Sequence, residues 1–287
     1  MLKKGYIYIL LTAIIFSTME IAGKIISDSV SPYQITFIRF LIGSFVLLPF
    51  AIKELRKRNL SLQKEDFTFF FVTGFLCVVV SMSLFQSAVL YTKASTVAIV
   101  FSTNPVFTIP FACLLLKEKL TKKTLSSLLV SFLGILFIMN PLHITGDFIG
   151  MIYAILSAIT FSLYSVVSKK RIEKYGGIIL NCATFIFGDV LLLIMMKFRD
   201  LPIIEGINAS NISILLYLGI VITGIGFMCY FLAMEKTSAS MASMAFFMKP
   251  ALASIFAFII LGEIIPINAI VGIVFIVGGA FIATYIN

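Results

Sequence analysis

The sequence has few of the side chains on which soluble proteins and enzymes depend. It contains no tryptophan, one histidine and four cysteines among 287 residues, and 12% of its residues are charged, about half the fraction in soluble domains. The single histidine, His143, stands in no metal-binding or nucleophile motif, and neither an HExxH motif nor a phosphate-binding loop is present. We therefore expect no enzymatic activity, no cofactor and no ATP-driven pump.

The cysteines and the basic residues do not indicate a metal site or a nucleic-acid partner. The cysteines fall in different apolar stretches without a CxxC pair, as expected of small apolar core residues rather than of a disulfide framework. The net charge of +9 arises from several short basic segments and not from one basic face or module. The four cysteines are Cys77, Cys113, Cys182 and Cys229.

Apolar residues are what the sequence has in abundance, at 60% of the chain with 29 phenylalanines. They form ten runs, each long enough as a helix to cross a hydrocarbon core about 30 Å thick. The sequence therefore predicts an all-α membrane protein with ten transmembrane helices in a lipid bilayer. The runs are 5–27, 33–52, 67–91, 94–116, 124–140, 147–168, 177–197, 212–234, 238–261 and 267–285.

The basic residues set the predicted orientation. With a cytoplasmic N-terminus, sixteen of the 22 basic residues fall in cytoplasmic segments. Only Lys93, Lys197 and Arg199 fall in segments on the outer side of the membrane. The positive-inside rule then places both termini in the cytoplasm. The first run has no small-residue cleavage motif behind it, so we expect a retained helix rather than a signal peptide. The expected location is a bacterial plasma or inner membrane.

The two halves of the chain match when one is shifted by 145 residues against the other. Because five spans is an odd number, the second half begins on the opposite side of the membrane, and the repeats are inverted. Many secondary transporters have this arrangement, with the substrate site near the midplane where the repeats meet. We predict two five-helix repeats, 1–142 and 146–287. Matched pairs include Gly5 with Gly150, Lys24 with Lys169, Thr92 with Thr237, Pro105 with Pro250, and Glu118 with Glu263.

Several motifs resemble the EamA-type family of the drug/metabolite transporter superfamily over essentially the whole chain. The resemblance implies a ten-helix basket around a central cavity, with the fifth and tenth helices peripheral, and export or exchange of amino acids and other small metabolites. It implies no particular substrate, because members move different solutes. The motifs are Thr92, Ala94 and Ser95; Thr237, Ala239 and Ser240; Pro105 and Pro250; Leu-Leu-Lys-Glu at 115–118; Leu-Gly-Glu at 261–263; and Arg39 with Phe40.

Five ionisable side chains fall inside predicted spans: Glu20, Lys24, Arg39, Asp189 and Lys249. A charge at a helix centre costs about 2.5–3.5 kcal/mol unless it is paired, hydrated or lifted to the surface. Glu20 and Arg39 lie at similar depth on neighbouring spans, so we expect them to pair, as part of a site or as a structural clamp. Lys24 lies near the outer end of its span, where we expect its ammonium to reach the headgroup region, with a place beside Glu20 as the alternative.

Lys249 is the expected centre of the substrate site. It lies in the middle of its span, directly before Pro250, which cannot donate a backbone hydrogen bond and frees carbonyls in the preceding turn. Its repeat partner, Asn104, is expected to face the same cavity from the other half. The alternative is that Lys249 forms a buried ion pair with Asp189. Gln86 adds neutral hydrogen-bonding capacity.

These residues predict a secondary transporter that exports or exchanges a small polar metabolite, such as an amino acid or a related zwitterion or carboxylate, by alternating access. Lys249 would hold an anionic group and Asn104 a polar one, whereas Glu20 or Asp189 would meet an amine or a coupling proton.

Pro105 and Pro250, at matched positions, are the predicted flexing points. A lipophilic-cation efflux carrier and a small-solute channel are the alternative functions on the same scaffold. Either a monomer or a homodimer would be compatible with the sequence.

Overall fold

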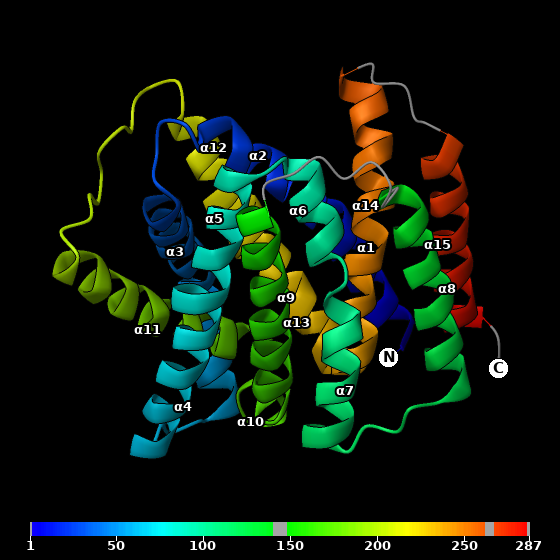
Figure 1. Ribbon diagram of the computed structural model, residues 1–287. Coiled ribbons are helices and arrows are strands. Elements are labelled where there is room, and N and C mark those ends of the chain that lie inside the picture. The colour runs from blue at the N-terminus through cyan, green and yellow to red at the C-terminus, as the bar shows by residue number, and fades with distance from the viewer. Residues whose placement is uncertain (1, 140–147, 262–266, 286–287) are drawn as a thin grey trace.

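The computed structural model describes residues 2–139, 148–261 and 267–285, which form helices and short connectors without a strand (Figure 1). His143 and Glu263 lie outside the described residues. The helices are α1 (Leu2–Phe16), α2 (Met19–Ile26), α3 (Pro32–Arg58), α4 (Lys64–Gly74), η1 (Phe75–Met82), α5 (Ser83–Tyr91), α6 (Ala94–Phe101), α7 (Asn104–Leu116), α8 (Lys122–Met139), α9 (Phe148–Lys169), α10 (Ile172–Tyr175), α11 (Gly177–Phe198), α12 (Ile212–Tyr217), η3 (Leu218–Gly226), α13 (Phe227–Lys236), α14 (Ala239–Leu261) and α15 (Ile267–Tyr285).

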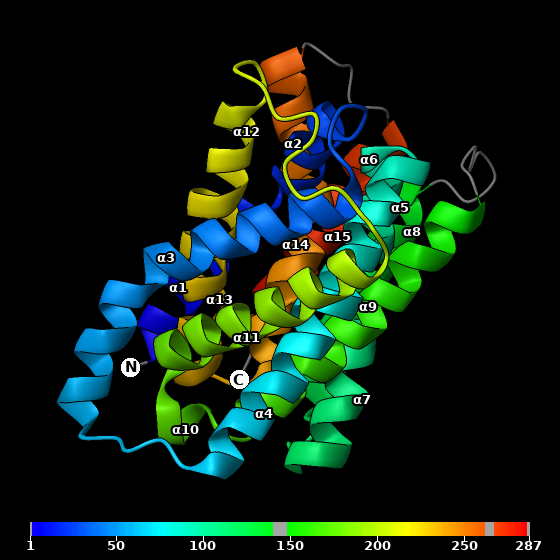
Figure 2. The same ribbon diagram turned by 90° about the vertical axis from the view of Figure 1, so that its left-hand side faces the viewer.

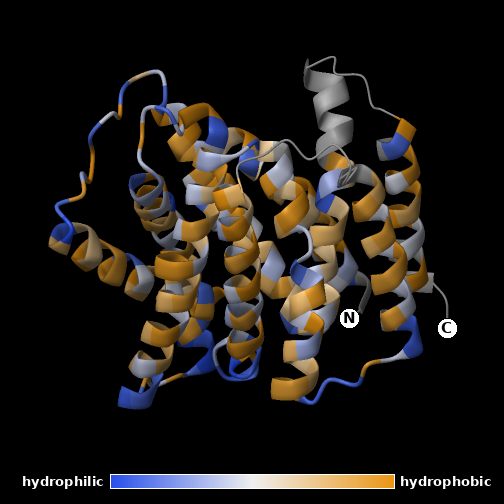
Figure 3. Cartoon of the chain, in the orientation of Figure 1, coloured by the Kyte–Doolittle hydropathy of each residue, from blue (hydrophilic) through white to orange (hydrophobic). Residues whose placement is uncertain are grey.

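The helices form a multi-pass membrane protein. Within the described residues, seven helical segments are long and apolar enough to cross a membrane. Large apolar side chains such as Phe45, Leu114 and Val274 are 65–76% exposed on the outward helix faces, and hydrophilic residues gather at the helix ends (Figure 3). A bilayer would cover such a surface, so the all-helical membrane class is confirmed, while the count of ten spans stays a prediction. The segments are Lys4–Ile26, Pro32–Arg58, Lys64–Tyr91, Thr96–Leu116, Phe148–Lys169, Gly177–Phe198 and Ile212–Lys236.

Contacts between the two predicted repeats are themselves matched. A methyl group added at Gly5 would meet Thr237, and one added at Gly150 would meet Thr92, the same pair shifted by 145 residues. The α3 and α11 helices lie side by side across the molecule (Figure 2). The α8 and α15 helices pack on each other at one edge (Figure 1). The two-repeat arrangement expected from the sequence therefore agrees with the packing.

Two lysines at matched positions cap helix ends. The Lys24 ammonium donates to the carbonyls of Val89, Leu90 and Thr92 at 3.0–3.3 Å, and the Lys169 ammonium donates to the carbonyl of Met234 at 2.7 Å. A cation at a helix C-terminus satisfies carbonyls that have no partner within the helix. The expectation that Lys24 reaches for the headgroups is therefore corrected, because backbone carbonyls at the end of α5 hold its ammonium.

Two helices of the first half are interrupted, whereas their counterparts in the second half are continuous. Ser17 and Thr18 separate α1 from α2, and Ser102 and Thr103 separate α6 from α7, but α9 and α14 run without a break. All four hydroxyls bond to carbonyls three or four residues earlier, a local interaction that competes with the helix ladder. Pro105 is the second residue of α7, just after one break, and Pro250 lies inside α14. The hinge role of these prolines stays a prediction.

Both repeats also contain a π-helical stretch in their third span. The η1 segment continues α4, and η3 continues α12, at overlapping positions of the two repeats. In each stretch one backbone carbonyl accepts from a hydroxyl five residues later: Val78 from Ser83, the first residue of α5, at 3.1 Å, and Leu218 from Thr223 at 2.8 Å. One carbonyl of each π-helical stretch is thus paired with a side chain, and such turns are frequent at functional sites.

The connectors divide between two faces of the molecule. The segments 59–63, 117–121 and 170–176 lie on one face, at the bottom of Figure 1, with most of the basic residues beside them. We call this the basic face. The segments 27–31, 92–93 and 199–211 lie on the opposite face.

Candidate functional site

Glu20 and Lys249 form an ion pair in the interior. The Lys249 ammonium lies 2.5 Å from Glu20 Oε1, and the two side chains are 2% or less exposed. Glu20 is the second residue of α2, just after the break between α1 and α2, and Lys249 comes from the middle of α14. The predicted pairing of Glu20 with Arg39 is therefore wrong, as is the alternative pairing of Lys249 with Asp189, because the two halves meet through Glu20 and Lys249 instead.

Arg39 and Asp189 lie near this pair without a complete set of partners. Arg39, on α3, donates one hydrogen bond, from Nη1 to the Met19 sulfur at 3.3 Å, and its Nε and Nη2 atoms have no partner. Neither carboxylate oxygen of Asp189, on α11, has a hydrogen-bond partner. Arg39 interacts electrostatically with Glu20, Asp189 and Lys249. We call these four side chains, two basic and two acidic, the charge cluster.

Unsatisfied polar atoms concentrate in this charge cluster. Within the described residues, seven buried side-chain polar atoms lack a hydrogen-bond partner, and five of them belong to Glu20, Arg39 and Asp189. A buried polar atom without a partner costs about 1–3 kcal/mol, so natural proteins rarely keep several together unless water or a ligand meets them. The charge cluster therefore has free hydrogen-bonding capacity for a polar solute.

Aromatic rings at repeat-matched positions surround the charge cluster. Phe16 packs on Phe246 at 5.9 Å, and the matched partners Phe161 and Phe101 pack at 5.6 Å. The Lys249 ammonium lies 5.3–5.9 Å from the ring centres of Phe85, Phe101 and Phe246, within range of cation–π attraction. The eight matched aromatic residues are Phe16 with Phe161, Phe40 with Phe185, Phe85 with Tyr230, and Phe101 with Phe246.

Two of the predicted neutral residues are engaged in interhelical contacts. Asn104 donates to the Ala158 carbonyl and to Ser162 Oγ at 3.1 and 2.7 Å, and its own amide oxygen accepts from Thr108. These bonds join α7 to α9. Gln86 donates a long hydrogen bond of 3.4 Å to the Gly23 carbonyl. The amide of Asn104 is thus already satisfied, and contact between either residue and a substrate stays a prediction.

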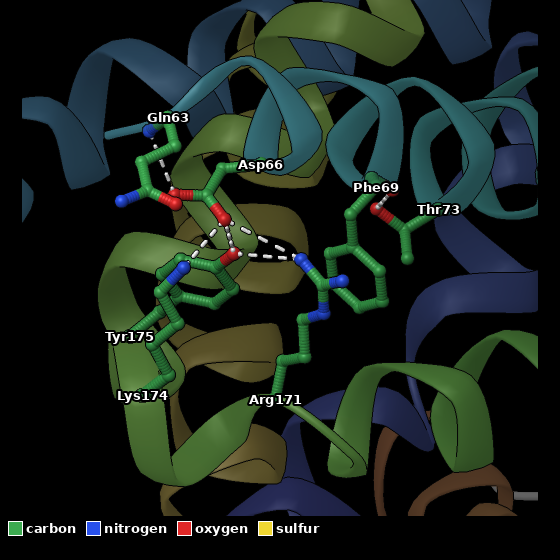
Figure 4. Close-up of polar contacts among 7 residues, drawn as sticks. All are labelled: Gln63, Asp66, Phe69, Thr73, Arg171, Lys174 and Tyr175. Carbon is green, nitrogen blue, oxygen red and sulfur yellow. Dashed lines mark hydrogen bonds and ion pairs between the residues drawn. The ribbon is translucent and has the colours of Figure 1, made fainter.

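A second polar cluster lies on the basic face. Asp66, at the start of α4, accepts from Lys174 at 2.6 Å, from the Tyr175 hydroxyl at 2.5 Å and from Arg171 at 3.4 Å (Figure 4). Its other carboxylate oxygen accepts from the backbone N–H of Gln63. The bond to Asp66 raises the pKa of Lys174, and burial together with that carboxylate raises the pKa of Tyr175. The segment around α10 is thereby fastened to α4.

Other polar contacts on the basic face also join the two predicted repeats. Arg58 bonds to Glu54 and to Glu235 at 2.7 and 3.3 Å. Glu118 accepts from the amides of Ala239 and Ser240 at the start of α14, beside a pocket of about 250 Å³. The residues lining it are Cys113, Glu118, Lys119, Leu120, Thr121, Thr124, Ser238 and Ser240.

Sequence reasoning missed the phenyl rings around Lys249 and the partners of Asp66. The rings carried a signal, because phenylalanines recur at the same offset that defines the repeat. The contacts of Asp66 carried none, since its partners come from a connector more than 100 residues away.

Comparison with known proteins identifies the family. The sequence profile of the EamA-like transporter family matches residues 3–140 and again 148–285. The chain belongs to this family. An uncharacterized transporter of Clostridium kluyveri is 47% identical over 98% of this chain and 93% of its own length. The uncharacterized transporter YoaV of Bacillus subtilis is 26% identical over 96% and 95%.

A solved crystal structure has a similar overall fold. It covers 98% of this chain and 96% of its own chain with a TM-score of 0.79 at 18% sequence identity. At this identity the likeness concerns the fold alone. Family and relatives together establish a membrane transporter, and the motifs that resembled the EamA type in the sequence are thereby confirmed.

Proposed function

We propose that this EamA-type transporter is a secondary carrier that exports or exchanges a small zwitterionic metabolite, such as an amino acid, by alternating access. The observation that supports this most is the charge cluster of Glu20, Arg39, Asp189 and Lys249, whose buried atoms retain free hydrogen-bonding capacity. Ionisable residues inside a membrane protein generally mark the path of a solute or a proton. The proposal includes ten spans, a cytoplasmic basic face and both termini in the cytoplasm of a bacterium.

The layout of the charge cluster suits a solute with both charges. Lys249 and Arg39 offer cationic donors to a carboxylate, and Glu20 and Asp189 offer acceptors to an ammonium group. Because a zwitterion is neutral overall, its entry adds no net charge to the interior. Asp189, with two unpartnered oxygens, is also the carboxylate best placed to exchange a coupling proton.

The helix breaks support movement at this place. Glu20 follows the break between α1 and α2, and the break between α6 and α7 lies directly before Asn104 and Pro105. Interrupted helices leave backbone groups available to a solute, and they occur at the binding sites of other secondary transporters. Alternating access would then repack the segments next to these breaks.

A second candidate function, export of an organic cation, is favoured by the phenyl rings. Three rings face the Lys249 ammonium within 6 Å, and aromatic rings of this kind also attract free organic cations. The zwitterion takes precedence because two cationic side chains, Arg39 and Lys249, already lie in the charge cluster and would repel a solute with positive charge only.

The test is counterflow of radiolabelled amino acids into proteoliposomes, together with thermal unfolding of the purified protein against pooled metabolites. A ligand at 100 times its Kd stabilises by about 2.7 kcal/mol. We expect saturable counterflow and stabilisation by zwitterions, both lost in Lys249→Ala and Glu20→Gln. Lys24→Met is the matched control, because it removes a lysine that caps α5 outside the charge cluster.

Three results would overturn the proposal. Stabilisation by lipophilic cations alone would favour the efflux function. Uptake without saturation or counterflow would indicate a channel. Equal responses of the parent and the two charge-cluster variants would remove the charge cluster from the substrate path.

A further inference from the structure

We infer that Glu20 and the rings of Phe85, Phe101 and Phe246 form an ammonium site that Lys249 occupies in the absence of substrate. The ammonium group of the substrate would take this site over, while Lys249 turns to the substrate's carboxylate. This inference deepens the proposed function and rests on it for the role of the site in transport. Its binding part can be tested without any transport assay.

The geometry of Lys249 supports a site for ammonium groups in general. A carboxylate at 2.5 Å and three phenyl rings with centres at 5.3–5.9 Å are the contacts that recognise an organic ammonium ion. The side chain of Lys249 is itself a primary alkylammonium, tethered to α14. It therefore shows which chemical group fits this space.

Glu20 also retains capacity for a second donor. Its Oε1 atom accepts from Lys249, whereas Oε2 is buried without a partner. An incoming ammonium can bond to Oε2 before Lys249 leaves Oε1, so that the carboxylate is never left alone. Two ammonium groups side by side repel each other, and the repulsion is relieved only if Lys249 finds another anion. A carboxylate on the same solute provides that anion.

The inference predicts a change of ligand class when Lys249 is truncated. Methylammonium or ethylammonium should not stabilise the parent, because Lys249 fills the site, but should stabilise Lys249→Ala. At ten times the Kd we expect a rise in Tm of about 3–6 °C over the same concentration of potassium chloride. The double variant Lys249→Ala with Glu20→Gln should show no such rise.

The outcomes separate this inference from the proposed function. If Lys249→Ala responds equally to alkylammonium and potassium salts, or if the response survives Glu20→Gln, the ammonium site does not exist. Amine binding to Lys249→Ala without zwitterion transport by the parent would keep the ammonium site and reject the function. If Lys249→Ala does not survive purification, Lys249→Ser prepared in ethylammonium answers the same question, because recovery of the folded protein should then require the amine.

A different observation carries a second inference, on the basic face. The contact of Asp66 with Lys174 has a counterpart at matched positions of the opposite face, where Asn211 bonds to Ser29 at 3.3 Å. The local cap is repeated as well. The backbone N–H of Gln63 donates to the Asp66 carboxylate, and the backbone N–H of Asn208 donates to the Asn211 side-chain oxygen. One contact is thus charged, whereas its counterpart is neutral.

The other ionic contact between the repeats on the basic face has no charged counterpart. Arg58 pairs with Glu235 at 3.3 Å, and the matched residues are Ile203 and Leu90, which cannot form an ion pair. Alternating access by inverted repeats exchanges the roles of the two faces. Unequal contacts at matched positions therefore bias the equilibrium between the two states.

We infer that Asp66, Arg171, Lys174 and Tyr175 form a latch that keeps the basic face closed in the substrate-free carrier. The neutral contact between Asn211 and Ser29 holds the opposite face closed less strongly than the latch holds the basic face. The substrate-free carrier is therefore open, or ready to open, on the opposite face. The inference rests on the proposed alternating access, and its test needs no substrate.

The test measures labelling by a maleimide at two single cysteines in a background without the native cysteines. Ser168→Cys lies buried near the basic end of α9, and Ser27→Cys lies buried at the opposite end of the molecule. Asp66→Asn keeps an acceptor for the Gln63 amide but removes the charge. We expect it to raise the labelling rate at position 168 at least tenfold and to lower the rate at position 27.

Glu65→Gln is the matched control, because it removes the same charge from the same turn at an exposed residue. It should leave both rates unchanged. A rise at both positions in Asp66→Asn would indicate general loosening, and no change at either would remove the latch; both results overturn the inference. Lys174→Gln, at an exposed partner of Asp66, gives the same test should Asp66→Asn fail to fold.

Discussion

The ion pair between Glu20 and Lys249 makes a prediction about stability that depends on its surroundings. Removing one partner of a buried pair costs about 3–5 kcal/mol, because the other charge is left alone. Here the two single variants should differ. In Lys249→Met, Arg39 still interacts electrostatically with Glu20, whereas in Glu20→Gln both Lys249 and Arg39 remain in the interior with Asp189 as the one acidic side chain left in the charge cluster.

We therefore expect Glu20→Gln to lose about 3–5 kcal/mol and Lys249→Met about 1–2 kcal/mol less. The double variant removes both charges with side chains of similar size. Since replacement of a buried pair by neutral groups is often close to neutral, it should be more stable than Glu20→Gln alone. At about 2–4 °C per kcal/mol, the Tm of Glu20→Gln should fall by about 10 °C and recover by several degrees in the double variant.

The composition of the chain decides the assay. Without tryptophan, intrinsic fluorescence gives a weak signal, but Cys77, Cys182 and Cys229 are buried thiols that react with a thiol-specific dye only after unfolding. Thermal scans at one fixed rate then compare the four proteins, because membrane proteins of this size often unfold irreversibly.

Comparison of the double variant with the two single variants can refute the coupling between Glu20 and Lys249. If the losses of the two single variants simply add in the double variant, Glu20 and Lys249 are not coupled, and the ion pair does not hold the interior together. If Lys249→Met is the less stable of the two single variants, Arg39 does not compensate Glu20, and the charge cluster is not one electrostatic unit.

Three further predictions concern the scaffold. Gly74→Ala places a methyl group 2.6 Å from the Gly188 amide nitrogen and should lower the Tm by the equivalent of about 1–3 kcal/mol, whereas Gly278→Ala, with no atom within 4 Å, should be neutral or stabilising in the same scan. Glu118→Ala removes the acceptor for the first amides of α14 and should cost about 1 kcal/mol, measured as Tm against Glu65→Ala. The folded-state pKa values of Lys174 and Tyr175 are raised, so their contribution to the free energy of unfolding is present at neutral pH and is lost as the pH rises through those values. Tm measured from pH 8 upward should therefore fall less in Asp66→Asn than in the parent.

The sequence was sufficient for the class, the family and the repeat, because these depend on patterns along the chain. Apolar runs of span length and pairs such as Thr92 with Thr237 are visible without coordinates. Some contacts could also have been predicted from the repeat. Because Lys24 matches Lys169 at the 145-residue offset, the same helix-capping role for both lysines agrees better with the repeat than headgroup contact for one of them.

The pairing of the interior charges could not be predicted in the same way. Depth along a helix placed Glu20 beside Arg39, but it gave no information on the direction in which each side chain points. The helix is also interrupted at Ser17 and Thr18, directly before the α2 helix that carries Glu20, so positions counted along one continuous helix do not apply there. Lys249 then reaches Glu20 from a helix more than 200 residues away, a distance in sequence that no local pattern covers.

The departures from symmetry gather around the features that transport would need. Ser17 with Thr18 and Ser102 with Thr103 interrupt helices only in the first half, although the same helices are matched in the second. Glu20 and Lys249, one from each half, have Ser165 and Asn104 as their repeat partners. A symmetric pair of halves provides two states of nearly equal energy, so contacts present in one half alone decide which state is occupied. Exchanging Asp66 for the asparagine found at its matched position removes one of these unequal charges with a single substitution, and is for that reason the most direct way to shift the resting state.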